Sequence, residues 1–177
     1  RHHAYDISPW QTTVVIDSDY MIFSNQLQKL LKSKQQILMH RQWYDIANNT
    51  TTVTRVGNSA IDMLWATVLK FDRTPEVKKF FLLWRRVIKH YHYYAKLFGF
   101  SSHVIRNDYA VSIALKQLMD FGEVEHCVIP WDIHTTRDTI KVKSFSENGI
   151  RLSDNHSVFD VTSDCHVLDK ESLLHAC

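Results

Sequence analysis

The stretch Thr12-Thr13-Val14-Val15-Ile16-Asp17-Ser18-Asp19 decides how the rest of the chain is interpreted. A run of β-branched residues leads directly into two aspartates separated by one residue, which predicts a buried strand over Thr12–Asp17. Two carboxylates at this spacing are suitable ligands for a hard divalent cation, which in turn can hold a phosphate or a diphosphate. Asp17 and Asp19 are therefore candidate metal ligands; the alternative is two acids that only cap a strand.

Length and composition indicate one globular domain over residues 1–177. The chain is 45% hydrophobic and 12% aromatic, and its four glycines and three prolines argue against a disordered or fibrous protein. A net charge of +2 argues against direct, sequence-specific binding of a nucleic acid. No apolar run reaches the roughly 18 residues of a membrane span. Cys127, Cys165 and Cys177 have no paired spacing and are expected to be free thiols.

Helix and strand signals along the chain predict an α/β or an α+β fold. The clearest is Thr74-Pro75-Glu76, which places an N-cap, a proline and an acid where a helix begins. Asn148-Gly149 between alternating segments predicts a hairpin. The other expected elements are a short helix over Gln26–Leu38, a loop over Asn48–Thr54, a buried strand within Ile61–Phe71, a buried helix over Asn107–Phe121, a short strand over Cys127–Trp131 and a terminal helix from Asp169.

The helix that starts at Thr74 has two different faces. From Val77 to Phe98 apolar residues recur at intervals of three and four, which predicts one long helix that Gly99 closes. Basic residues occupy the opposite face, which we interpret as a solvated face. They are Lys78, Lys79, Arg85, Arg86 and Lys89.

Four segments of the chain together resemble a known family. They are a Pro-aromatic turn into the Asp-x-Asp strand (Tyr5–Asp19), a strand that runs into the Thr-Pro-Glu helix (Trp65–Glu76), an acid that opens a buried helix (Arg106–Leu115), and a late His with a Lys nearby (Asp164–Lys170). In order and spacing they resemble glycosyltransferases of the GT-A type, which use nucleotide-diphospho-sugar donors. The whole pattern is similar to uncharacterised glycosyltransferase-like proteins of large tailed phages.

The resemblance implies a metal-dependent transfer of a sugar from a nucleotide-diphosphate donor to an acceptor. It implies that Asp17 and Asp19 hold Mn²⁺ or Mg²⁺, with His166 as a third ligand. A neutral imidazole among the ligands favours Mn²⁺ over Mg²⁺. By the same resemblance Lys170 contacts the diphosphate, and Asp108 lies near the acceptor or the anomeric carbon.

The chain also departs from the family pattern. The resemblance implies a mixed sheet flanked by helices, but only 16 residues precede Asp17, so we expect the strands that bind the base and ribose to be missing. Because the chain starts Arg1-His2-His3 without Met, we interpret it as a fragment or a processed product. The bulk of Trp65 is expected to narrow the acceptor pocket.

Two other functions remain open at this stage. One is a hydrolase of the phosphatase type, in which Asp17 attacks phosphorus and Asp19 is the general acid. The other is a non-catalytic GT-A-like module that binds partner chains in an assembly, such as a virion. The expected location is the cytoplasm, or the host cytoplasm if the protein is viral. Association with the virion is the alternative.

Overall fold

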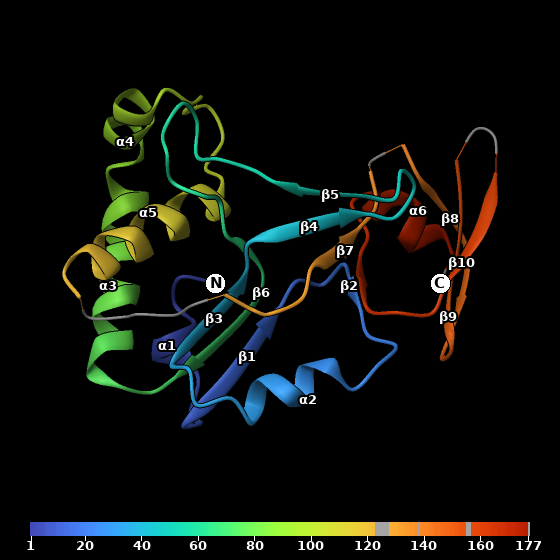
Figure 1. The fold of residues 1–177 in the computed structure, drawn as a ribbon, viewed down its shortest axis with the longest axis horizontal. Coiled ribbons are helices and arrows are strands. Elements are labelled where there is room, and N and C mark those ends of the chain that lie inside the picture. The colour runs from blue at the N-terminus through green and yellow to red at the C-terminus, as the bar shows by residue number, and fades with distance from the viewer. Residues whose placement is uncertain (123–127, 138, 155–156, 177) are drawn as a thin grey trace.

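The chain folds into a mixed α/β structure, seen in a computed structural model that describes residues 1–122, 128–137, 139–154 and 157–176 (Figure 1). Its helices are α1 (Ala4–Ile7), α2 (Gln26–Leu31), α3 (Pro75–Lys89), α4 (Tyr91–Phe98), α5 (Asn107–Asp120) and α6 (Lys170–His175). Its strands are β1 (Thr12–Ile16), β2 (Tyr20–Met21), β3 (Ile37–His40), β4 (Gln42–Asp45), β5 (Thr50–Val53), β6 (Trp65–Asp72), β7 (Ile133–Thr135), β8 (Lys141–Ser146), β9 (Gly149–Ser153), β10 (Val158–Val161) and β11 (Cys165–His166). Among these described residues no helix is both long and apolar enough to cross a lipid bilayer.

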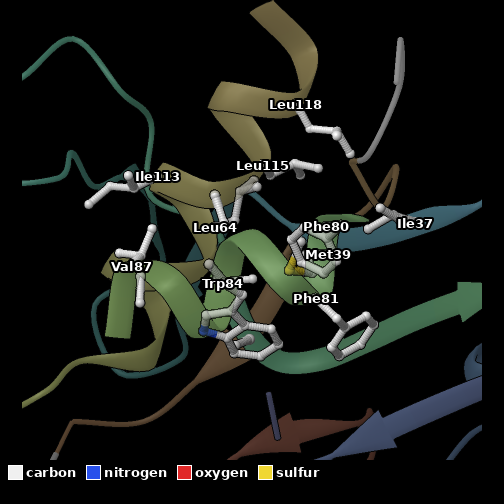
Figure 2. Close-up of a cluster of buried hydrophobic side chains, with 14 of the residues drawn as sticks. Ile37, Met39, Leu64, Phe80, Phe81, Trp84, Val87, Ile113, Leu115 and Leu118 are labelled. Atoms are coloured by element: carbon white, nitrogen blue, oxygen red, sulfur yellow. The ribbon is translucent and has the colours of Figure 1, made fainter. Parts of the chain in front are cut away.

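The first sheet is antiparallel, with the strand order β1-β6-β3. Helices α3 and α5 pack together and bury their apolar side chains against one face of it. Figure 2 shows Phe80, Phe81 and Trp84 of α3 in this core, close to Met39 of β3. On the other face α2 places Leu30 in a second apolar cluster. The central strand β6 is therefore covered on both sides, as its nearly continuous apolar sequence requires.

Two further sheets complete the fold. The mixed sheet has the order β2-β11-β7-β4-β5, in which β7 is parallel to both β11 and β4. The hairpin sheet has the order β10-β9-β8 and packs against α6. The hairpin sheet lies at one end of the molecule, and α3 and α4 lie at the other (Figure 1).

Local sequence signals predicted several elements correctly. Thr74 caps α3, because its hydroxyl accepts a hydrogen bond from the Val77 amide at 3.3 Å. Gly99 closes α4 in the left-handed conformation, with a φ of +68°. The hairpin expected from Asn148-Gly149 is present between β8 and β9, but its two turn residues are Glu147 and Asn148, and Gly149 pairs with Ser146 as the first residue of β9. The buried helix begins at Asn107, as expected, and ends at Asp120.

Long-range strand pairing overturned other predictions. The helix expected over Gln26–Leu38 ends at Leu31, and Ile37–His40 forms β3 because pairing with β6 buries all four residues. The segment Asn48–Thr54 is not a loop throughout, because Thr50–Val53 pairs with β4 as strand β5. Threonine favours strands, and this preference decides the conformation once β4 is available as a partner.

Two more predicted elements were wrong. The long helix is interrupted at His90, where φ and ψ are −111° and 32°, so that α3 and α4 are separate helices. In the segment expected as a strand over Cys127–Trp131, the described residues form only one isolated bridge, between Val128 and Met39. Cys127 and Cys177 lie outside the described residues, and Cys165 is a free, buried thiol.

Candidate metal centre

Asp17 and Asp19 lie on the turn that connects the first sheet to the mixed sheet. The Asp17 amide donates to the Thr67 carbonyl at 2.9 Å, which extends the pairing of β1 and β6 by one residue. The Tyr20 amide then donates to the Asp17 carbonyl at 3.1 Å, and β2 begins at Tyr20. The two aspartates are thus held between two sheets by backbone hydrogen bonds.

The short strand β11 brings His166 to the same turn. It pairs antiparallel with β2, so that His166 lies opposite Tyr20. The Val167 amide donates to the Asp19 carbonyl at 2.9 Å. His166 is therefore fixed beside Asp19 by main-chain hydrogen bonds, although the two residues lie near opposite ends of the sequence.

Asp17, Asp19 and His166 form a cluster in which one ligand atom from each side chain lies within 4.8 Å of the other two. Nε2 of His166 is 3.4 Å from Oδ2 of Asp19. Nζ of Lys170, at the start of α6, is 3.1 Å from the same oxygen. Asp17 also forms an ion pair with the guanidinium of Arg1. Four of these five residues, all except Arg1, are predicted from the sequence, and the structure brings those four together.

The charges around Asp19 keep it ionised. Burial acts to raise the pKa of Asp19, but His166, when its ring is protonated, and the hydrogen bond and charge of Lys170 outweigh burial, so the pKa lies below its ordinary value. Asp19 is 3% exposed, whereas the Lys170 side chain is 65% exposed. Asp19 is therefore a buried carboxylate that meets solvent-facing positive charge on one side.

His166 is in the protonation state that a metal ligand needs. Burial lowers its pKa, and the nearby Asp19 and Asp108 only partly oppose this effect. The imidazole is thus neutral at neutral pH, which is the form that coordinates a cation.

The hydrogen-bond pattern also fits a cation. Among the described residues, Oδ1 of Asp19 and Nδ1 of His166 are buried without a hydrogen-bond partner. Buried polar atoms are rarely left unpaired, so each such atom requires an explanation. Two carboxylates and an imidazole form a donor set that suits Mn²⁺.

Asp108 has a different role from the cluster residues. It lies in the first turn of α5, and its Oδ1 accepts a hydrogen bond from the Ala66 amide at 2.9 Å. Its charge acts on His166, so it lies in the neighbourhood of the centre, but it is not one of the three clustered ligands. The observed contact makes Asp108 a residue that fixes the start of β6.

Two tryptophans form an aromatic wall next to the cluster. The rings of Trp65 and His166 are nearly perpendicular, with centroids 6.5 Å apart, and Trp43 lies 6.1 Å from Trp65. The indole nitrogen of Trp65 is buried and has no hydrogen-bond partner among the described residues. The bulk of Trp65 is evident from the sequence, but Trp43 could not be predicted as its neighbour, because strand β4, which positions Trp43, gives no clear signal.

Comparisons with protein-family models, curated proteins and solved structures find no match for this chain. The candidate metal centre and its geometry are therefore the basis for a proposed function.

Proposed function

We propose that the chain is a divalent-cation-dependent glycosyltransferase domain that takes a sugar from a nucleotide-diphosphate donor. The observation that carries this proposal is the convergence of Asp17, Asp19 and His166, with Lys170 beside them. Mn²⁺ or Mg²⁺ is the expected cation, and when bound it would stabilise the negative charge of a leaving diphosphate.

Each residue of the centre has a distinct role in this proposal. Asp17, Asp19 and His166 hold the cation through two carboxylates and one neutral imidazole. Lys170 is exposed and reaches Asp19 from the solvent side, so its ammonium group is placed to meet a diphosphate oxygen. Trp65 and Trp43 form the wall against which a sugar ring packs.

The phosphatase alternative fits this centre less well. A general acid must carry a proton at the working pH, but the neighbours of Asp19 lower its pKa. The unpartnered Oδ1 of Asp19 and the adjacent imidazole favour metal ligation over proton donation. The described contacts therefore support a ligand role for Asp19.

The non-catalytic alternative predicts an apolar sheet edge that a partner covers. The outer strand of the mixed sheet, β5, is fully exposed, but three of its four residues are threonines. An edge of exposed threonines is not the apolar edge that this alternative predicts. This observation does not favour a docking module, and the experiment below separates the two functions.

A thermal-shift panel with Mn²⁺ and different nucleoside diphosphates tests the proposal. A ligand that binds only the folded state, at one hundred times its dissociation constant, adds about 2.7 kcal/mol to the free energy of unfolding. We expect Mn²⁺ and one nucleoside diphosphate together to raise the melting temperature more than either alone. Turnover of the matching sugar nucleotide should then depend on Mn²⁺.

Matched variants make this result specific. Asp17→Asn should abolish both the Mn²⁺-dependent shift and turnover, because the amide removes one charged ligand. Asp160→Asn is the control, since Asp160 is an exposed carboxylate that pairs with Arg151. No shift with any combination of metal and nucleotide, or unchanged turnover in Asp17→Asn, would reject the glycosyltransferase assignment.

A further inference from the structure

Positive charge is concentrated in one part of an otherwise acidic chain. Residues 77–107 contain 7 of the 21 Lys and Arg residues and none of the 19 Asp and Glu residues. The remaining residues therefore carry 14 basic and 19 acidic groups, a net charge of −5, against +7 for this stretch. The overall charge of +2 conceals this separation. The positive charge is carried by α3, α4 and the segment that follows them.

The exposed charges of α3 lie on a single face. Lys78, Lys79, Leu82, Arg86 and Lys89 are all exposed, and we call them the basic face. Their spacing places them on one side of a helix that is about 22 Å long at 1.5 Å per residue. The opposite side of α3 is buried in the core that Figure 2 shows. The basic face therefore points away from the first sheet, into solvent.

An exposed leucine lies in the middle of these cations. Leu82 is one turn from Lys78 and one turn from Arg86, and it is 51% exposed. The next helix continues the pattern, because Tyr93 and Leu97 of α4 are 65% and 57% exposed and flank the exposed Lys96. Helices that lie on membranes combine cations with apolar side chains in this way.

We propose that the basic face docks on a lipid surface that contains anionic phospholipids. Lys and Arg side chains are attracted to such a surface, and Leu82 can enter the boundary between head groups and acyl chains. A nucleic-acid backbone would attract the same cations but would offer Leu82 no apolar surface. Arg85 is not part of the basic face, since it pairs with Asp6 at 2.7 Å. This inference does not depend on the metal centre.

Vesicle sedimentation with the whole chain tests the proposal. We expect the protein to bind phosphatidylcholine vesicles that contain phosphatidylserine and not vesicles of phosphatidylcholine alone. Binding should weaken at high salt, because screening shortens the range of the attraction. The triple variant Lys78→Gln, Arg86→Gln, Lys89→Gln should lower the partition coefficient by about tenfold or more.

A matched triple variant provides the control. Lys29, Lys32 and Lys34 are exposed and lie in or just after α2, on the other face of the first sheet. Changing all three to Gln removes the same charge and should change the partition coefficient less than about twofold. Circular dichroism should show that both variants remain folded, since every changed side chain is exposed.

Leu82→Ser separates a lipid partner from a nucleic acid. It keeps all the charges and should still reduce vesicle binding, because it removes the apolar contact. Three results would overturn the proposal. The first is vesicle binding without a preference for phosphatidylserine, and the second is an equal loss of binding in the two triple variants. The third is a nucleic-acid pattern: the basic-face triple variant abolishes binding to duplex DNA or RNA, and Leu82→Ser leaves vesicle binding unchanged.

Discussion

Asp45 and Asp19 are both buried carboxylates next to short strands, but their surroundings differ. Both oxygens of Asp45 are satisfied within the protein. Its Oδ1 accepts hydrogen bonds from the amides of Ala47 and Asn48, at 3.0 and 3.3 Å. Its Oδ2 accepts from the Asn48 side chain at 2.7 Å and from Arg137 at 2.6 Å. Asp45 thus closes the turn after β4 and joins it to the loop after β7.

The hydrogen bonding of the Asp19 carboxylate is incomplete. Its Oδ2 meets His166 and Lys170, whereas its Oδ1 has no hydrogen-bond partner in the described parts of the chain. A second carboxylate, Asp17, lies in the same cluster, which adds repulsion between like charges. Asp45 therefore serves the fold, and we infer that Asp19 has surroundings that a positively charged ligand would complete.

The largest expected effect on stability follows from Asp45→Asn. The new amide group must face donors that now meet a carboxylate oxygen, so the free energy of unfolding should fall by roughly 3 kcal/mol. Asp19→Asn should lower it by less, since one oxygen of Asp19 has no hydrogen-bond partner in the described parts of the chain and Asp17 adds repulsion between like charges. Urea denaturation of the two variants measures both values. Equal destabilisation would remove the distinction between the two carboxylates.

A smaller effect concerns His40, a buried histidine that, unlike His166, has no acidic group among the causes of its pKa shift. His40 is 1% exposed, and burial followed by the charge of His134 lowers its pKa to about 3. In the unfolded chain the imidazole of His40 takes up a proton near the usual pKa of about 6.5. The contribution of neutral His40 to the free energy of unfolding is therefore complete above that pH and is lost as the pH falls towards 3. At pH 5 the loss should be about 2 kcal/mol.

The variant His40→Leu checks this assignment. It should flatten the dependence of the unfolding free energy on pH between about 6.5 and 5. His103→Leu is the control, because His103 is exposed. A slope that persists in His40→Leu would mean that another group causes the loss of stability in acid.

The smallest effect concerns the choice of metal. His166→Asn exchanges an imidazole for an amide oxygen or nitrogen, so the preference for Mn²⁺ over Mg²⁺ should fall by about tenfold. Competition between the two metals, followed by the electron paramagnetic resonance of free Mn²⁺, measures the ratio. An unchanged ratio would show that His166 does not touch the metal.

The same contrast shows what could be predicted from the sequence. The cap at Thr74 and the β8–β9 hairpin were predicted from local signals, since the residues that make the contacts are neighbours in the chain. Asp17 and Asp19 were also found locally, at the end of an apolar strand. These parts of the fold and the site depend on short-range physical chemistry.

Other parts depend on partners that are distant in the sequence. The sequence predicts the end of a helix where β3 lies, because only the pairing with β6 makes this segment a strand. The role of Asp45 could not be predicted, because Arg137 completes its hydrogen bonds from a distant loop. The position of His166 beside Asp19 was expected only from a family resemblance, and the pairing of β2 with β11 is its physical cause.

A calorimetric titration of Mn²⁺ into the wild-type chain and the Asp19→Asn variant tests the central claim most directly. We expect one site in the wild type, an affinity at least about one hundredfold lower in Asp19→Asn, and no change in Asp160→Asn. Mn²⁺ binding of equal strength in the wild type and in Asp19→Asn, or no binding to the wild type, would contradict the claim that Asp19 is arranged to hold a cation.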